Sequence, residues 1–520
     1  NVYMTFEIVF VLLSLLGMVA ALIADKMRPG MILFSVVVLF LCAGILTPKE
    51  MLEGFSNKGM ITVALLFLVS EGIRQSGTLG QVIKKLLPQG KTTVFKAQLR
   101  ILPSVAFISA FLNNTPVVVI FAPIIKHWAK SVNLPATKFL IPLSYVTILG
   151  GICTLIGTST NLVVHGMILE AGFEGFSMFE LGKVGIFIAI AGIIYIFLFS
   201  KRLLPDARPD TAVPDEEVEE GEKLHRVEAV LGARFPGINK KLKDFNFQRH
   251  YGAEVKEIKT RNGQRFVSNL EEVVLHEGDT LVVMADDTFI PTWGESSVFV
   301  LLTNGNEPDT TGKKKRWFAL LLLVLMIVGA TVGELPITKE MFPDIKLDMF
   351  FFVSITTIIM AWTNLFPARK YTKYISWDIL ITIACAFAIS KAMENSGFAA
   401  LIARHIIGMS SSMGPYALLA IVFIITNIFT ELITNNAAAA LSFPIALSVA
   451  TQLGVDPTPF FVVICMAASA SFSTPIGYQT NLIVQGIGSY KFTDFVKIGL
   501  PLNLITFLIS VFVIPMIWKF

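Results

Sequence analysis

The sequence predicts an all-α polytopic membrane protein made of two inverted repeats, each with five spans and one re-entrant hairpin, and a small α+β insert between them. Residues of the set AVILMFWYC make up 54% of the 520 residues, and charged residues only 15%, whereas globular domains carry about 25%. About half of the charged residues fall between Lys201 and Arg316. Polar motifs recur in the two apolar parts about 320 residues apart. This composition excludes a soluble enzyme, a secreted disulfide scaffold and a disordered protein.

The spans follow from the length of the apolar runs, because a helix needs about 20 apolar residues to cross a bilayer. They are expected at 5–24, 30–47, 60–76, 139–167 and 179–200, and again at 317–334, 348–366, 377–393, 458–486 and 496–517. Two longer apolar regions, at about 95–126 and about 413–450, have polar residues at their midpoints. Each region is expected to form a re-entrant hairpin of two short helices, which enters the membrane and leaves it on the same side.

The insert divides the chain into two membrane repeats, 1–200 and 317–520. An acidic linker at 201–222 leads into a domain at 223–290, and a second linker at 291–316 leads out of it. Strand-like runs, turn signals and one short amphipathic helix predict an α+β fold: strands at 227–231, 255–259 and 280–284, turns at 236–237 and 262–263, and the helix at 238–245. Its sequence carries no catalytic motif, so a binding or dimerisation module is expected.

The positions of Lys and Arg predict the orientation of the chain. Of the basic residues that flank the expected spans, 22 fall on the side of the insert and 8 on the other. Because basic residues concentrate on the cytoplasmic side, the insert is expected to be cytoplasmic and both termini outside. The first hairpin would then enter from inside and the second from outside. The chain starts at Asn1 rather than at a methionine, so residues before it are expected to be missing.

The two halves repeat each other at a nearly constant offset. The segment 111–123 matches 432–444, and 157–166 matches 477–486. Five spans is an odd number, so the second half must be inverted in the membrane. Inverted repeats with interrupted helices are the construction of secondary transporters, whose site lies near the bilayer midplane. A duplicated structural bundle is the alternative, but it would not place interrupted polar segments at matching mid-membrane positions.

Four polar motifs carry the predicted site. Two are hairpin tips, Asn113-Asn-Thr-Pro116 and Thr434-Asn-Asn-Ala437, and two are helix breaks, Gly157-Thr-Ser-Thr-Asn161 and Gly477-Tyr-Gln-Thr-Asn481. Their amides and hydroxyls can bind a cation through oxygen and an anion through N–H or O–H. A helix that starts after a tip favours an anion, and no Lys or Arg occurs in the motifs. The alternative is that these groups only cap and pack helices.

Two ionisable residues near the motifs have alternative interpretations. Glu431 lies in a hairpin arm, and intramembrane acids are functional by default, so it could carry a proton or help to bind a cation. The equivalent Ala110 offers no second acid, which favours a buried, hydrogen-bonded structural acid. His165 is interpreted as a polar residue near a helix end rather than a proton relay.

The tips, the Gly-X-X-X-Asn breaks and the insert resemble the divalent anion/sodium symporter family of the ion transporter superfamily. The resemblance covers both membrane halves. The insert, with Pro236-Gly-Ile-Asn-Lys-Lys-Leu242 and His276-Glu-Gly-Asp279, is similar to a TrkA-C (RCK C-terminal) domain. The combination is similar to bacterial sulfate-type permeases, which implies a multi-pass protein of the bacterial inner (plasma) membrane. It also implies a homodimer, an elevator mechanism in which a transport domain moves against a scaffold, and Na⁺ and anion bound at the tips.

When the roles of these motifs in the family are carried over to the matching residues, the resemblance implies two Na⁺ sites and one substrate site. The substrate-binding residues are Asn114, Thr115, Pro116, Thr158, Ser159, Asn435, Asn436, Tyr478 and Gln479. The first Na⁺ site comprises Ser109, Asn113, Asn114, Gly157 and Asn161, and the second comprises Thr430, Thr434, Asn435, Thr474, Gly477 and Asn481. Asn436 and Tyr478-Gln479 depart from the dicarboxylate-binding pattern of the family, which places dicarboxylate specificity in doubt.

The leading hypothesis is Na⁺-coupled symport of a small divalent oxyanion, sulfate first, modulated by the cytoplasmic domain. No organic cofactor, enzymatic activity or nucleic-acid partner is expected. The domain could bind a small regulatory ligand such as a nucleotide or a cyclic dinucleotide, or serve only as a dimer clamp. Three alternatives stay open: a proton-coupled carrier or exporter that uses Glu431, a di- or tricarboxylate symporter, and a nutrient sensor that has kept a transporter fold.

Overall fold

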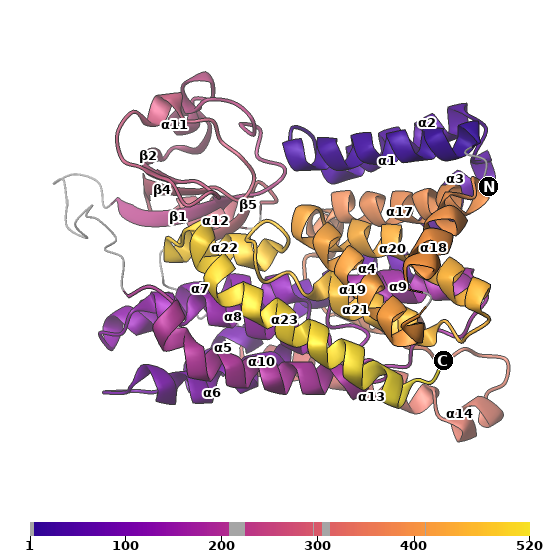
Figure 1. Ribbon diagram of the computed structural model, residues 1–520. Coiled ribbons are helices and arrows are strands. Elements are labelled where there is room, and N and C mark those ends of the chain that lie inside the picture. Colours follow the sequence, from indigo (N-terminus) through magenta and orange to yellow (C-terminus); the bar gives the residue numbers. More distant parts are fainter. Residues whose placement is uncertain (1–4, 207–223, 295, 304–311, 411) are drawn as a thin grey trace.

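The computed structural model describes residues 5–206, 224–294, 296–303, 312–410 and 412–520. Most of these residues lie in helices that run roughly parallel to one another, and a small sheet domain lies at one end of the helical body (Figure 1). The C-terminus lies at the opposite end (Figure 1). The helical prediction for both halves and the predicted α+β insert are confirmed.

The two halves contain similar series of helices, with one short helix more among the described residues of the second half. The first half has α1 (Phe6–Ala24), α2 (Pro29–Cys42), α3 (Pro48–Glu53), α4 (Lys58–Gln75), α5 (Thr78–Leu86), α6 (Val94–Ser109), α7 (Asn114–Ser131), α8 (Leu140–Gly151), α9 (Ser159–Glu170) and α10 (Gly182–Leu203). The second half has α13 (Lys313–Gly333), α14 (Pro336–Met341), α15 (Met349–Trp362), α16 (Tyr371–Tyr374), α17 (Trp377–Asn395), α18 (Phe398–Met409), α19 (Gly414–Leu432), α20 (Asn435–Leu453), α21 (Thr458–Ser469), α22 (Gln479–Gly488) and α23 (Phe492–Ile517).

Each expected span corresponds to a helix or a broken helix pair, although fewer of these helices are long and apolar enough to cross a membrane by themselves. Among the described residues, seven helices are long and apolar enough to cross a membrane, or up to eight if one bent pair counts as a span. The expected spans at 139–167 and 458–486 are each divided into two short helices, α8 with α9 and α21 with α22. The breaks fall at Gly157 and Gly477, where the sequence predicted unwound backbone.

The two hairpins open toward opposite ends of the molecule. Near the end of α7, Lys126 contacts the insert through Glu228, with 2.9 Å between Nζ and Oε1. Near the start of α19, Tyr416 contacts Phe520 at the C-terminus, with 6.0 Å between ring centroids. Because the insert and the C-terminus lie at opposite ends (Figure 1), the second hairpin is inverted relative to the first, as the odd number of spans predicts.

The helices form two sets, which we call the site bundle and the outer bundle. The site bundle consists of α6–α10 and α19–α23, and it contains both hairpins and both broken pairs. The outer bundle consists of α1–α5 and α13–α18, where α2 packs on α17 and α4 packs on α15. The two bundles meet where α9 contacts α4, where α7 contacts α5, and where α20 contacts α17 and α18.

The insert is an antiparallel sheet with the strand order β3-β2-β4-β1-β5. Its elements are β1 (His225–Leu231), α11 (Phe247–Tyr251), β2 (Glu254–Lys259), β3 (Arg265–Phe266), β4 (Thr280–Ala285), α12 (Phe289–Trp293) and β5 (Phe299–Thr303). The three predicted strands are confirmed. The sheet extends further than expected, because β5 lies within the segment 291–316, interpreted above as a linker, and pairs with β1. Most of the expected acidic linker, 207–222, lies outside the described residues.

The helix predicted at 238–245 is wrong. Asn239 has a φ of +61°, and its N–H donates to the Leu275 carbonyl at 2.7 Å, while the Leu242 N–H donates to the Val273 carbonyl at 3.0 Å. Backbone donors that pair with the neighbouring segment cannot also close helical turns. The segment therefore forms turns and one 3₁₀ turn, Leu242–Asp244.

One face of the insert is docked on the site bundle. Val230 and Leu301 belong to the apolar core of the membrane part rather than to that of the insert. A Cβ on Gly486 of α22 would lie 2.1 Å from Thr280 Oγ1, so this glycine permits the close approach. Burial disfavours the carboxylate of Glu228, but Lys126, Lys259 and Arg226 outweigh it and hold its pKa below the usual range.

Glu228→Gln should weaken this docking, because it removes the buried carboxylate charge that pairs with the Lys126 ammonium. Breaking a buried ion pair costs about 3–5 kcal/mol; partial exposure of Lys126, at 23%, reduces the expected loss to about 1–3 kcal/mol. Thermal unfolding of the purified protein should show a midpoint several degrees lower. Glu272→Gln, which alters an exposed pair with Lys241, is the matched control. An unchanged midpoint in Glu228→Gln would contradict a stabilising role.

Candidate functional site

Each hairpin tip contacts the helix break of the opposite half. At the first tip, the Thr115 hydroxyl donates to Gln479 Oε1 at 3.5 Å. At the second tip, Asn436 Oδ1 accepts from the Thr160 hydroxyl at 3.3 Å and lies 3.5 Å from Ser159 Oγ. The four motifs, which are more than 300 residues apart across the repeat, therefore form one polar cluster.

Four helices begin at this cluster. They are α7 at Asn114, α9 at Ser159, α20 at Asn435 and α22 at Gln479. The first turn of a helix presents unpaired N–H groups and the positive end of its dipole. Four such ends create a positive potential without any basic side chain, since no Lys or Arg occurs in the motifs. This arrangement suits an anion.

The first tip brings three oxygen atoms together at its base. Ser109 Oγ lies 2.7 Å from Asn114 Oδ1 and 2.9 Å from the Thr147 carbonyl oxygen. The hydroxyl has a single proton, which can serve only one of these acceptors. Ser109 and Asn114 are both buried. Such a group of oxygens is chemically suited to a hard cation.

The second tip repeats this arrangement with one more oxygen. Thr430 Oγ1 lies 2.6 Å from the Asn435 side chain and 2.5 Å from the Ala468 carbonyl. The same amide atom of Asn435 lies 3.2 Å from the Ala468 oxygen and 3.0 Å from the Gly477 oxygen. These oxygens can be satisfied in two ways: the Asn435 side chain can turn its NH₂ group toward them, or a cation can bind among them.

The asparagines that end the two breaks hold the unwound backbone. Asn161 Nδ2 donates to the Thr154 carbonyl at 2.9 Å, and Asn481 Nδ2 donates to the Ser471 carbonyl at 2.9 Å. Asn481 Oδ1 accepts from the Ser144 hydroxyl at 2.6 Å. Asn161 Oδ1 is buried and has no hydrogen-bond partner among the described residues. The two asparagines thus position the breaks.

Glycine is required where the broken helices approach other backbone. A Cβ on Gly157 would lie 2.3 Å from the Gly151 carbonyl oxygen, and a Cβ on Gly477 would lie 2.7 Å from the Thr430 carbonyl oxygen. A Cβ on Gly151 would lie 2.7 Å from Asn114 Oδ1. Real Cβ contacts of this length would force the backbone apart, so these glycines keep the tips against the breaks.

The remaining predicted residues have different surroundings. Asn113 begins the turn into α7 without a side-chain capping bond, and with Ser159 and Ser70 it lines a small cleft between the tip, α4 and α13. Thr434 caps α20, because its Oγ1 accepts from the Ala437 N–H at 3.3 Å. Pro116 lies in the first turn of α7, half-buried beside the tip. Thr474 donates to Glu431 rather than facing the oxygens around Asn435.

The carboxylate of Glu431 is surrounded by donors. It accepts from Asn503 Nδ2 at 2.7 Å, from Thr474 Oγ1 at 2.8 Å and from the Ser473 N–H at 3.2 Å. These partners belong to the second break and to α23, so Glu431 connects the hairpin arm to both. This favours the structural interpretation of the acid. His165 Nδ1 accepts from the Phe176 N–H at 3.0 Å, which fixes the loop after α9.

Sequence reasoning missed several residues that the fold brings to the site. The carbonyls of Thr147 and Ala468 and the side chains of Ser144 and Asn503 contact the tips and breaks. Backbone carbonyls leave no signal in side-chain identity. Asn503 did leave one, since it is an amide within the apolar run of α23.

The fold and site together define a multi-pass membrane transporter. A family model described as that of citrate transporters (CitMHS) matches residues 19–353 and 341–520. The chain belongs to this family. Its two matches cover both membrane halves and the insert.

Other proteins are similar over shorter or longer parts of the chain. An uncharacterized transporter of Synechocystis is 30% identical over 93% of this chain and 92% of its own length. Sodium/sulfate cotransporter 1 of Chlamydomonas reinhardtii is 30% identical over 56% of this chain and 32% of its own length. The crystal structure of the YdaH transporter from Alcanivorax borkumensis has a TM-score of 0.51 at 12% identity and covers 98% of this chain and 97% of that one, which shows likeness of fold.

Gly157→Ala should abolish transport, because the added Cβ would overlap the Gly151 carbonyl and separate the first break from its tip. Gly408→Ala is the control, since a Cβ at this position in α18 meets nothing within 4 Å. Uptake into vesicles, normalised to the amount of folded protein in the membrane, is the measurement. Wild-type uptake by Gly157→Ala would show that the close packing of the break is dispensable.

Proposed function

We propose that the protein couples the inward movement of Na⁺ to the transport of a small divalent oxyanion, and that the anion is sulfate. The observation that carries the proposal is the convergence of four helix N-termini on a cluster of hydroxyls and amides that contains no basic side chain. Dipoles and O–H or N–H donors suit a compact dianion. The relatives named as sodium/sulfate cotransporters support the choice of sulfate.

Two oxygen groups support Na⁺ as the coupling ion. One lies around Ser109, Asn114 and the Thr147 carbonyl, and the other lies around Thr430, Asn435 and the carbonyls of Ala468 and Gly477. Each touches a tip whose helix begins at the anion site. A cation there would also lower the cost of holding a dianion close by. The two Na⁺ sites of the proposal are therefore built mainly from these oxygens.

Proton coupling through Glu431 is the weaker alternative. Its two carboxylate oxygens accept hydrogen bonds from three side chains and one N–H. A group that must exchange protons with water on both sides of a membrane needs access, whereas this one is enclosed by donors. We therefore assign Glu431 the role of positioning the second hairpin.

An elevator movement fits the division into two bundles. The site bundle carries all four motifs, and it contacts the outer bundle where α20 packs on α17 and α18 and where α9 packs on α4. In the proposal the site bundle moves across the membrane against the outer bundle, which a homodimer partner would anchor in the bacterial inner membrane. The insert lies on the cytoplasmic side, where it could bind a small regulatory ligand.

Purified protein reconstituted in liposomes tests the function directly. Uptake of labelled sulfate should require an inward Na⁺ gradient and should be competed by unlabelled sulfate. Replacement of Na⁺ by K⁺ should abolish it. Uptake that is driven by a pH gradient and does not depend on Na⁺ would contradict the proposal and would support the proton-coupled alternative. Absence of uptake together with ligand-dependent changes in the insert would favour a sensor.

Asn114→Ala and Asn435→Ala should each reduce uptake by about 10–100-fold, because a hydrogen bond to a charged ligand contributes about 1.5–3 kcal/mol. Ser109→Ala and Thr430→Ala should instead raise the Na⁺ concentration for half-maximal uptake, since each removes one oxygen. Asn395→Ala is the control, an amide that bonds Glu50 in the outer bundle. Wild-type Na⁺ dependence in both hydroxyl variants would remove them from the cation sites.

A further inference from the structure

The two repeats differ most at one position of the site. Thr158 and Tyr478 are equivalent in the repeat and stand at the N-cap of α9 and of α22. Gly157 is matched by Gly477 and Asn161 by Asn481, while the next position changes from Ser159 to Gln479. An aromatic ring thus replaces a short hydroxyl side chain on one side only.

The hydroxyl of Tyr478 lies where all four motifs meet. It accepts from Asn114 Nδ2 at 3.2 Å and lies 3.2 Å from Thr158 Oγ1. The side chain of Asn435 lies beside it as well. The side chain comes from the second break, so this one group touches both tips and the other break. Tyr478 is 8% exposed.

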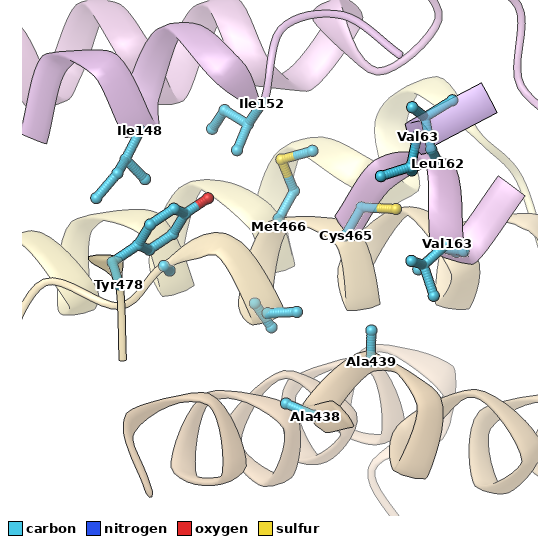
Figure 2. Close-up of a cluster of buried hydrophobic side chains, with 14 of the residues drawn as sticks. Val63, Ile148, Ile152, Leu162, Val163, Ala438, Ala439, Cys465, Met466 and Tyr478 are labelled. Carbon is cyan, nitrogen blue, oxygen red and sulfur yellow. The ribbon is translucent and has the colours of Figure 1, made fainter. Parts of the chain in front are cut away.

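The ring is held in place by apolar neighbours. Figure 2 shows it beside Ile148, Ile152 and Met466, which come from both repeats. A buried aromatic ring packed in this way is rigid. Its hydroxyl is already bonded to Asn114 and Thr158, so it is not free to turn toward a longer ligand.

We propose that Tyr478 is the size-determining residue of the substrate site and limits it to a compact, single-centre oxyanion. The inference deepens the proposed function. Sulfate carries both charges on one tetrahedral group, whereas a dicarboxylate needs room for two separated carboxylates. The Tyr478 hydroxyl contacts Asn114 of one tip and Asn435 of the other, and the rigid side chain that carries it takes up room that we expect a second carboxylate to need. Dicarboxylates and tricarboxylates are therefore excluded by volume rather than by charge.

The test measures inhibition of labelled sulfate uptake by succinate and citrate in liposomes. Wild-type uptake should resist both. Tyr478→Thr, which restores the residue of the equivalent position, should lower the half-inhibitory succinate concentration by at least about tenfold. Tyr478→Phe keeps the volume and should stay resistant, although it transports more slowly. Tyr478→Leu, which keeps an apolar side chain at this buried position, serves if the threonine variant does not fold.

If Tyr478→Thr or Tyr478→Leu still transports sulfate and resists succinate, the size-determining role of Tyr478 is overturned, whereas the proposed function is not affected. Sensitivity in Tyr478→Phe would also overturn that role, since hydrogen bonds rather than volume would then exclude succinate. Wild-type uptake of succinate in place of sulfate would contradict the proposed function as well. The two failures are therefore distinguishable.

A second inference comes from the insert, which contacts both bundles. Its docked face contacts α7 and α22 of the site bundle through Glu228, Gly278 and Thr280. On another side, Arg261 forms an ion pair with Asp25 at the α1–α2 junction of the outer bundle. Asn239 Nδ2 also donates to the Lys26 carbonyl at 3.0 Å.

We infer that the contact of Arg261 and Asn239 with the α1–α2 junction is a latch that restrains the site bundle. The docked face buries apolar and charged groups on α7 and α22, whereas the latch consists of one ion pair and one hydrogen bond. When the site bundle moves with the insert attached, the weaker contact must break. This inference rests on the elevator movement proposed above.

Glu277 adds a pH dependence to the latch. It faces Asp25, Arg28 and Asp378 of the outer bundle and Arg261 of the insert. Burial, followed by the two neighbouring carboxylates, raises its pKa to about 7. This position therefore favours the protonated, neutral carboxyl of Glu277. The contact between the insert and the α1–α2 junction is strongest below the pKa of an ordinary glutamate, and it is lost as pH rises through about 7.

Charge reversal tests the latch. Arg261→Glu and Asp25→Arg should each raise the initial uptake rate about two- to fivefold, and the double swap should restore the wild-type rate. Lys256→Glu, an exposed charge paired within the insert, is the control. The rate of amide hydrogen exchange in the segment 25–28 should rise in Arg261→Glu. This measurement reports on the contact independently of which substrate is transported. Wild-type rates and exchange in both single variants would overturn the latch.

The pH arm uses the same uptake assay. Between about pH 6 and about pH 8 on the insert side, wild-type uptake and exchange at 25–28 should both rise, because burial and the carboxylates of Asp25 and Asp378 disfavour ionised Glu277 more than Arg28 and Arg261 favour it. Glu277→Gln should flatten both profiles and hold them at the low-pH level. A profile in Glu277→Gln identical to that of the wild type would remove Glu277 from the latch.

Discussion

Backbone that is interrupted inside a membrane must find its partners within the protein, and this constraint organises the whole structure. Two hairpin tips and two helix breaks would each leave unpaired groups in an apolar medium. Each tip is therefore placed against the break of the other half, where Thr115 contacts Gln479 and Asn436 accepts from Thr160. The inverted repeat makes this exchange possible, since it brings the interrupted segments of both halves to the same depth.

The same constraint supplies the chemistry of the site. Chain reversals and breaks create helix starts, and four of them converge without a basic side chain. An anion held by dipoles can be released more readily than one held by an arginine, because no desolvated ion pair has to be broken. In the proposed function, the carbonyls and hydroxyls at the base of each tip provide the oxygen ligands for a cation. The proposed anion and cation sites then arise from the two ends of the same interruptions.

The insert extends the tertiary network beyond the membrane part. It is docked by a buried face on α7 and α22 and touches the α1–α2 junction through a few polar groups. In the proposed latch, this difference in contact strength separates a permanent attachment from a reversible one. The insert would then influence movement by changing the stability of one small contact.

The sequence by itself determined the repeats, the hairpins and the positions of the motifs. Polar runs such as Asn113-Asn-Thr-Pro116 within apolar helices can only be interruptions, and their recurrence 320 residues later requires a second, equivalent set. The strands of the insert also followed from local patterns. The helix expected at 238–245 did not form, because pairing with the segment 273–275 competed for its backbone groups.

Only the tertiary structure decided which groups meet. It assigned the break asparagines to holding backbone carbonyls, surrounded Glu431 with donors from α23, and brought the carbonyls of Thr147 and Ala468 to the tips. It also placed the Tyr478 hydroxyl between both repeats. The physical reason is that burial and hydrogen bonding depend on distances between segments far apart in the chain, and carbonyl oxygens are identical in every residue. Local sequence therefore specifies where the chain is interrupted, whereas packing specifies which groups each interruption contacts.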